Sequence, residues 1–134
     1  MRTLAILTAT CVAAAWLGTP PVSAEQTYSG NGDYQVFCAS CHGATAKGDG
    51  VIAKSLAKRP SDLTQLTARN NGEFPEEKVA RTIDGRELES AHGNADMPAW
   101  GDVFAKSQES QGPEAAKARI TALVQYLKTI QEKR

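Results

Sequence analysis

The pattern of apolar positions along the chain predicts a helical domain. One stripe at the spacing i, i+3, i+4, i+7 consists of Tyr34, Phe37, Cys38 and Cys41. It predicts a first helix that Asn31 caps and that ends near Cys41. A longer stripe with helical spacing consists of Ala116, Ile120, Leu123, Val124, Leu127 and Ile130. Gly112 and Pro113 precede it and open the longest predicted helix.

Shorter helices are predicted between these two. Pro75 is a good first residue for a helix that has Val79 and Ile83 on its inner side and closes at Gly85. Further short helices are expected at Val51 to Lys58, with Ile52 and Leu56 inward, and at Trp100 to Ala105. Glycine-rich or polar loops are expected at Gly43 to Gly50, Asn70 to Gly72 and Arg86 to Pro98.

The predicted fold class is therefore all-α, with four or five helices and long loops. No segment of the sequence alternates between apolar and polar residues as a half-buried strand does. The loops are too long for a plain helical bundle of this size. We therefore expect a flat, apolar cofactor in the middle of the domain.

The N-terminal residues have the features of an export signal. Arg2 supplies a positive charge, residues 4–17 form an apolar run, and small residues lead up to a cleavage point after Ala24. The alternative is a membrane anchor, but the run is shorter than the roughly 20 apolar residues of a spanning helix. We expect a signal peptide at 1–24, one domain at 25–134 and no membrane insertion after cleavage.

The exported domain is small and nearly neutral. The full chain has 134 residues with 15 basic and 15 acidic side chains, and loss of Arg2 leaves a net charge of −1. This balance predicts no nucleic-acid partner. A domain of this size buries roughly two thirds of the surface of its unfolded chain. A large buried cofactor would add to its limited core.

The candidate chemistry lies in Cys38-Ala-Ser-Cys41-His42. Cleavage removes Cys11, so Cys38 and Cys41 are the two cysteines of the exported domain. A thioredoxin-like dithiol would need a βαβ context, which the predicted helices do not supply. A structural zinc site needs four ligands, and adjacent Cys41 and His42 point about 100° apart on a helix.

Haem attachment explains every residue of this motif. The thiols of Cys38 and Cys41 add to the two vinyl groups of the porphyrin, and His42 supplies the proximal ligand of the iron. In bacteria this attachment occurs outside the cytoplasm, in agreement with the export signal. We prefer haem, with zinc and the dithiol as the alternatives.

The iron then needs a sixth ligand, and Met97 is the candidate. After Met1 it is the only methionine of the chain. A lone methionine is usually core filler, but this one lies in a polar loop where Pro98 restrains the backbone. His92 is the competing imidazole, and we expect it at the surface or near the haem propionates.

Two further side chains are candidates for contact with the propionates. Arg86 offers a guanidinium and Trp100 an indole N–H. The alternative interpretations are a solvated loop arginine and a tryptophan that only fills the core. The expected apolar shell of the haem consists of Tyr34, Leu56, Trp100 and Leu123.

At these residues the chain resembles the class I, single-haem bacterial cytochromes c. In that family a glycine and an aromatic residue precede the first haem cysteine at steps of four, as Gly30 and Tyr34 do here. An aromatic residue of the last helix packs beside that glycine, and Tyr126 in LVQYLK stands in its place. Other shared elements are Gly48-Asp-Gly50, Arg59-Pro-Ser-Asp-Leu-Thr64, Ile83-Asp-Gly-Arg86 and His92-Gly…Met97-Pro-Ala-Trp-Gly101.

The resemblance implies a cytochrome c fold, in which crossing N- and C-terminal helices and the other helices wrap one covalent haem c. It implies low-spin iron with His42 and Met97 as axial ligands. The function that follows is a periplasmic electron carrier, not an enzyme, which we expect to be a monomer that meets a redox partner protein. The alternative is a haem c subunit permanently docked on a periplasmic oxidoreductase.

The chain departs from the family in one place. Related sequences often have proline after Gly-Asp-Gly, where this chain has Val51. A family proline near that position accepts the hydrogen bond of the proximal histidine. The sequence therefore does not identify the carbonyl group that holds His42.

Overall fold

The computed structural model describes residues 27–86, 97–107 and 112–132. All regular elements in these ranges are helical, which confirms the predicted all-α class. In chain order they are α1 (Gly30–Asp33), the π-helical turn η1 (Tyr34–Cys38), α2 (Ala39–His42), the 3₁₀ turns η2 (Ala53–Ser55) and η3 (Leu63–Gln65), α3 (Leu66–Arg69), α4 (Glu76–Asp84), α6 (Trp100–Lys106) and α7 (Pro113–Thr129). In the same ranges, no helix has both the length and the apolar character needed to span a bilayer.

The first helical segment contains α1, η1 and α2 and therefore runs through the cysteine motif. Its cap is Ser29, whose hydroxyl accepts a hydrogen bond of 3.1 Å from the N–H of Gly32. The prediction of Asn31 as the cap is wrong, because Ser29 is the residue with extended backbone angles and Asn31 is already helical. A π-helical hydrogen bond joins the Ala39 N–H to the Tyr34 carbonyl in the middle of the segment.

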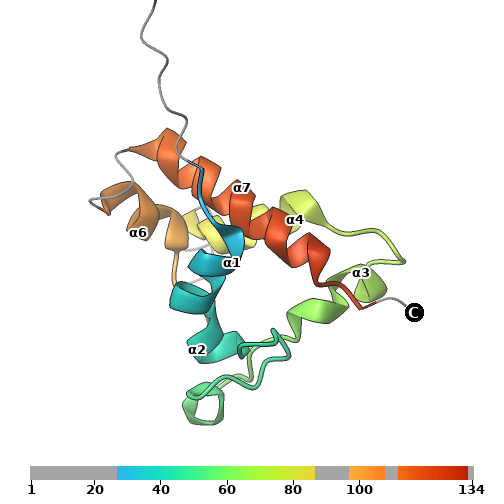
Figure 1. Ribbon diagram of the computed structural model, residues 1–134. Helices are drawn as coiled ribbons and strands as arrows, with labels where there is room; N and C mark the ends of the chain where they lie inside the picture. The colour runs from blue at the N-terminus through green and yellow to red at the C-terminus, as the bar shows by residue number, and fades with distance from the viewer. Residues whose placement is uncertain (1–26, 87–96, 108–111, 133–134) are drawn as a thin grey trace, which may run out of the picture.

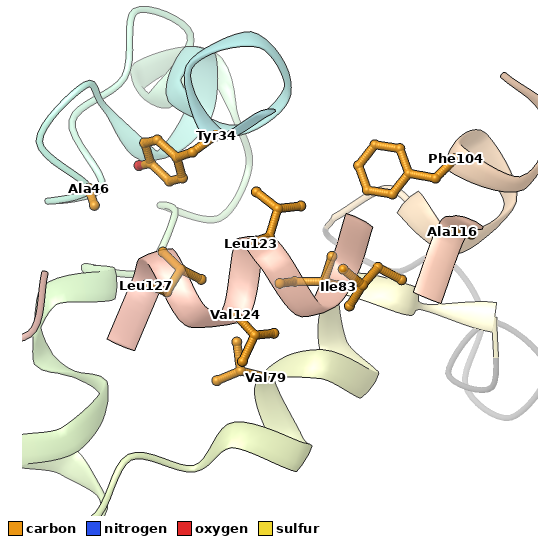
Figure 2. Packing of buried hydrophobic residues seen from close by; sticks show 10 residues of the cluster. Tyr34, Ala46, Val79, Ile83, Phe104, Ala116, Leu123, Val124 and Leu127 are labelled. Atoms are coloured by element: carbon orange, nitrogen blue, oxygen red, sulfur yellow. The ribbon is translucent and has the colours of Figure 1, made fainter. Parts of the chain in front are cut away.

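The last helix, α7, is the centre of the packing (Figure 1). It contacts α1, α4 and α6. Its predicted apolar stripe is confirmed, since the buried members include Ala116, Ile120, Leu123, Val124 and Leu127. Figure 2 shows Leu123 on the side of α1 and α6, and Val124 opposite Val79 of α4.

The first and last helices cross at Gly30, as the resemblance implied. A Cβ atom added there would lie 2.7 Å from the carbonyl carbon of Ala122 and 2.9 Å from the Cβ of Tyr126. The rings of Tyr34 and Tyr126 pack next to this crossing, with centroids 5.3 Å apart. Glycine is needed here because any side chain would separate the two backbones.

The predicted helix after Pro75 is also confirmed. Val79 and Ile83 on α4 are buried, and Gly85 ends the helix in a left-handed conformation with φ 71°. The helix begins at Glu76, so Pro75 is its cap and not its first residue.

The prediction for residues 51–58 is wrong. Only Ala53–Ser55 form a 3₁₀ turn, and the side chains of Ile52 and Leu56 are 42% and 37% exposed. The Ile52 N–H donates to the Ser40 carbonyl. The Ile52 backbone is therefore bound to the helix of the cysteine motif, and the Ile52 side chain does not enter the core. The helical residues 63–69 were not predicted, although Asp62 caps them with a hydrogen bond from Thr64 N–H.

Candidate functional site

The cysteine motif lies at the end of the first helical segment. Cys38 and Cys41 are both partly buried and neither is in a disulfide. The π-helical turn η1 ends at Cys38 and α2 contains Cys41 and His42. Such turns insert one extra residue into a helix and often occur at functional sites. They carry no signal in the apolar pattern, so sequence analysis predicted a regular helix.

The His42 ring is held by the backbone of a distant segment. Its Nδ1 lies 3.0 Å from the carbonyl oxygen of Ser61. A carbonyl can only accept, so Nδ1 donates its proton, and in a neutral ring Nε2 would then carry the lone pair. This is the tautomer of a metal-binding histidine that a second group orients. The sequence did not identify the carbonyl that holds His42. It is that of Ser61, the residue after Pro60.

A glycine-rich loop folds back over the end of α2. The N–H of Gly48 donates to the His42 carbonyl at 2.7 Å, and that of Gly50 donates to the Cys41 carbonyl at 3.1 Å. A Cβ at Gly50 would come within 2.6 Å of the carbonyl carbon of Cys41. The Tyr34 hydroxyl donates to the Gly43 carbonyl at 2.7 Å. The loop thus satisfies the helix end that carries the motif.

Met97 is far from Cys38 in the sequence, but both side chains pack against the same apolar cluster. It is partly buried, and the following Pro98 is exposed. The Met97 segment is held close to the end of α4, because a Cβ at Gly85 would approach the Cα of Ala99 to 2.7 Å. The structure therefore brings the methionine segment and the attachment helix to one core.

Arg86 lies near this segment, beside Gly101, the residue after Trp100. The Arg86 guanidinium forms two hydrogen bonds with Asp84, of 2.6 and 2.7 Å. Its Nε would be 2.7 Å from a Cβ at Gly101, the residue after Trp100. This ion pair lowers the pKa of Asp84, chiefly through its hydrogen bond with Arg86. That Arg86 and Trp100 contact the haem propionates stays a prediction. His92 lies outside the described residues.

Comparison with protein families now decides what kind of domain this is. The family described as cytochrome c oxidase, cbb3-type, subunit III matches residues 25–127. The chain belongs to this family. It is therefore a cytochrome c domain, a class that binds haem c covalently, typically carries electrons rather than catalysing reactions, and is typically exported. No curated protein and no solved structure matches the chain significantly.

The apolar residues expected around the haem of this cytochrome differ in burial. Tyr34 and Leu123 are fully buried and face each other across the crossing (Figure 2). Trp100 is partly buried and packs edge-on against Phe37, with ring centroids 5.5 Å apart. Leu56 lies at the surface, whereas Ala53 of η2 is buried, so the expectation that Leu56 points inward is wrong.

The cytochrome also contains a buried ion pair that sequence analysis missed. Arg119 of α7 donates two hydrogen bonds of 2.7 Å to the Asp33 carboxylate. The guanidinium also lies over the rings of Phe37 and Phe104, 5.0 and 4.9 Å from their centroids. A signal existed, because Arg119 lies three residues after Ala116 and four before Leu123, on the apolar face of its helix.

Burial also affects two titratable groups beside the motif. Burial is the largest cause that raises the pKa of the Cys38 thiol to about 11, and the carboxylate of Asp33 adds to it. Burial likewise raises the pKa of Tyr34 well above its usual range. At neutral pH both side chains are therefore uncharged.

Proposed function

We propose that this cytochrome is a periplasmic electron carrier with one haem, ligated by His42 and Met97 and bound through Cys38 and Cys41. The observation that carries the proposal is the hydrogen bond from His42 Nδ1 to the Ser61 carbonyl. It orients the ring and leaves Nε2 as the basic nitrogen. A histidine that only lies at the surface or fills the core does not need its ring oriented by such a hydrogen bond. His42 also follows two unpaired cysteines in the sequence.

The donor set of the attachment helix fits haem c. Cys38 and Cys41 are unpaired and accessible in part, as side chains that form two thioethers must be. Among the described residues, no cluster of histidine, cysteine and acidic side chains could hold a metal ion by itself. His92, the fourth candidate ligand of a zinc site, lies outside these residues, so the porphyrin interpretation is supported by the family match instead.

Met97 is the proposed sixth ligand. Its side chain packs on the core cluster that also contacts Cys38, and its backbone is restrained by Pro98 and by the contact between Ala99 and Gly85. A soft thioether opposite an imidazole stabilises the reduced iron and raises the reduction potential. A restrained segment keeps that ligand in place in both oxidation states.

Bound haem would supply a one-electron couple at the iron. The protein's part is to hold both axial side chains, so that electron transfer requires little rearrangement. Tyr34 and Leu123 are fully buried beside the motif and keep water from its inner side. Arg86 and Trp100 are the proposed propionate contacts, and the proximity of the Arg86 guanidinium to Gly101 supports this.

The periplasmic location rests on the N-terminal sequence and on the chemistry of haem attachment. The family match begins at residue 25, the first residue after the proposed cleavage point. We propose that the exported domain is a monomer without membrane insertion or nucleic-acid binding, and that it exchanges electrons with a partner protein.

A second candidate function is a haem c subunit permanently docked on an oxidoreductase. The observation in its favour is the family description, which names a subunit of an oxidase. Purification of the native protein distinguishes the two candidates. A free carrier is expected to elute alone at the size of one domain, whereas a docked subunit elutes with a catalytic chain.

The axial ligands are tested by optical spectroscopy of the oxidised holoprotein. Methionine ligation gives a weak near-infrared band from sulfur-to-iron charge transfer. We expect Met97→Ala to lose this band and to bind carbon monoxide when reduced, whereas the control His92→Ala keeps the band. Loss of axial ligation in His92→Ala and not in Met97→Ala would assign the sixth position to the imidazole. Carbon monoxide binding by the wild type at neutral pH would exclude the closed site.

A further inference from the structure

The carbonyl that holds His42 belongs to a short segment, residues 60–67. Ser61 is exposed, whereas Leu63 and Leu66, farther along in η3 and α3, pack against the core cluster. Hydrogen bonds fix the segment further on two sides. The Leu63 N–H donates to the Ala46 carbonyl at 2.7 Å, which fixes one side of the segment to the loop after the motif.

The other side of the segment is bound by residues 131–132, which follow α7 near α3 (Figure 1). The side-chain amide of Gln131 donates to the carbonyls of Leu63, at 2.8 Å, and Leu127, at 2.7 Å. Its oxygen accepts from the Thr67 N–H at 2.9 Å. Two carbonyls at the nitrogen and one N–H at the oxygen define the orientation of the amide. Gln131 therefore bridges α7 to both ends of the 63–67 stretch.

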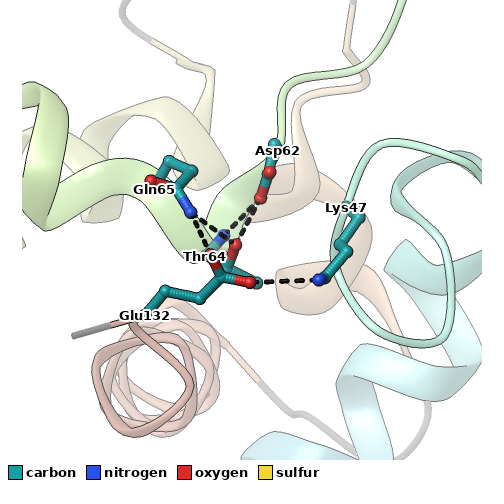
Figure 3. Close-up of polar contacts among 5 residues, drawn as sticks. All are labelled: Lys47, Asp62, Thr64, Gln65 and Glu132. Atoms are coloured by element: carbon teal, nitrogen blue, oxygen red, sulfur yellow. Dashed lines mark hydrogen bonds and ion pairs between the residues drawn. The ribbon is translucent and has the colours of Figure 1, made fainter. Parts of the chain in front are cut away.

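Glu132 adds a second set of contacts at the same place (Figure 3). Its N–H donates to the Thr64 carbonyl at 3.0 Å. Its carboxylate pairs with Lys47 at 3.0 Å and accepts from the Gln65 amide. The Asp62 carboxylate meanwhile accepts from both the N–H and the hydroxyl of Thr64. The C-terminus thus joins the segment to the loop that contains Lys47.

We propose that Gln131 is a positioning residue for the proximal histidine: by clamping residues 63–67 to α7, it holds the Ser61 carbonyl against His42 Nδ1. The proposal rests on His42 as the haem ligand. The same helix crosses the attachment segment at Gly30. Therefore α7 determines the position of the helix that contains His42 and also the position of the carbonyl that orients the His42 ring.

The physical consequence concerns the ligand strength of the imidazole. A hydrogen bond from Nδ1–H to a carbonyl makes the other nitrogen more basic. A more basic donor favours the oxidised iron. Loosening the clamp weakens this hydrogen bond, so it raises the reduction potential and exposes the Nδ1 proton to exchange with solvent.

The test compares Gln131→Ala with Gln125→Ala in the holoprotein. Gln125 lies on α7, which Gln131 follows, but it donates to Glu76 of α4, so its loss leaves residues 60–67 untouched. Loss of about 1.4 kcal/mol of hydrogen bonding corresponds to a tenfold larger open population. We expect the His42 Nδ1 proton, followed by nuclear magnetic resonance of the reduced protein, to exchange about tenfold faster in Gln131→Ala only. The reduction potential is expected to rise in the same variant.

A residue that merely ends α7 would behave differently. The proposal is overturned if Gln131→Ala lowers the unfolding free energy but changes neither the proton exchange nor the potential relative to Gln125→Ala. If Gln131→Ala fails to fold, Gln131→Met keeps the side-chain length without the hydrogen bonds, and the same two readouts decide. A wild-type spectrum without a histidine-ligated haem would instead refute the proposed function.

Discussion

Two regions beside the cysteine motif are held by different forces. At the helix crossing, which we define by Gly30, Asp33, Arg119, Ala122 and Tyr126, backbones touch and charged groups are buried. The loop region, residues 43–65, instead depends on backbone hydrogen bonds and leaves apolar side chains at the surface, with Val51 90% exposed. The two sides of His42 are therefore expected to tolerate substitutions to different degrees. Single substitutions at buried positions of the crossing are costly, whereas exposed side chains of the loop region, such as Val51, tolerate change; its glycines, among them Gly50 packed against Cys41, do not.

The largest expected effect is at the buried ion pair. Asp33→Ala leaves the Arg119 guanidinium without its carboxylate in a site where both side chains are about one-tenth exposed or less. Such a loss costs about 3–5 kcal/mol of the unfolding free energy. Guanidinium denaturation of the oxidised holoprotein measures it. The double variant Asp33→Ala with Arg119→Met is expected to recover most of the loss. A single variant as stable as the wild type would show that the crossing does not depend on this pair.

A slightly smaller effect is expected from Gly30→Val. The added side chain would meet the backbone of Ala122, which cannot move aside by a rotamer change. Overpacking of this kind costs roughly 1–3 kcal/mol, and the backbone contact places this variant at the upper end. Thermal unfolding followed by far-ultraviolet circular dichroism measures it. An unchanged melting temperature would mean that the two helices can separate without loss.

The same substitution in the helical core around α7 and in the loop region gives the sharpest contrast. Val124 is 2% exposed between α7 and α4, whereas Val51 is 90% exposed in the loop region. Val124→Ala removes two buried methyl groups and is expected to cost roughly 2 kcal/mol. Val51→Ala is expected to stay within about 0.5 kcal/mol of the wild type. Equal losses in denaturant unfolding would contradict the distinction between the regions.

The smallest of these effects is expected at a hydrogen bond that joins the two regions. The buried Tyr34 hydroxyl donates to the Gly43 carbonyl, and Tyr34→Phe is expected to cost about 1 kcal/mol through loss of that hydrogen bond. Burial raises the pKa of Tyr34 in the folded state. The stability that this neutral phenol contributes is therefore complete below its unfolded pKa of about 10 and is lost as the pH rises above it.

The pH dependence gives this prediction its control. Above pH about 10, the unfolding free energy of the wild type is expected to fall by up to about 1.4 kcal/mol per pH unit from this one proton. Tyr34→Phe lacks that contribution, so the difference between the two proteins should shrink with rising pH. A difference that stays constant up to pH 11 would show that Tyr34 ionises normally.

The sequence predicted the helices better than the connections between them. The stripe of α7 and the Gly85 end of α4 are local patterns, and both are confirmed, whereas Pro75 precedes α4 instead of being its first residue. The failure at Ile52 and Leu56 had a physical reason, because their spacing suits a helix but the Ile52 N–H pairs with Ser40 of another segment. The ligands His42 and Met97 were predicted from residue type and motif alone, and their role stays a prediction.

The sequence by itself determined the all-α class, the attachment motif and the family, because periodicity and short motifs are local properties of a chain. Only the tertiary structure decided which carbonyl holds His42, that Asp33 pairs with Arg119, and that Gln131 clamps the segment of Ser61. Each of these contacts joins residues 19 or more positions apart. A hydrogen bond over such a separation depends on the path of the backbone between its partners, and that path is set by packing against α7.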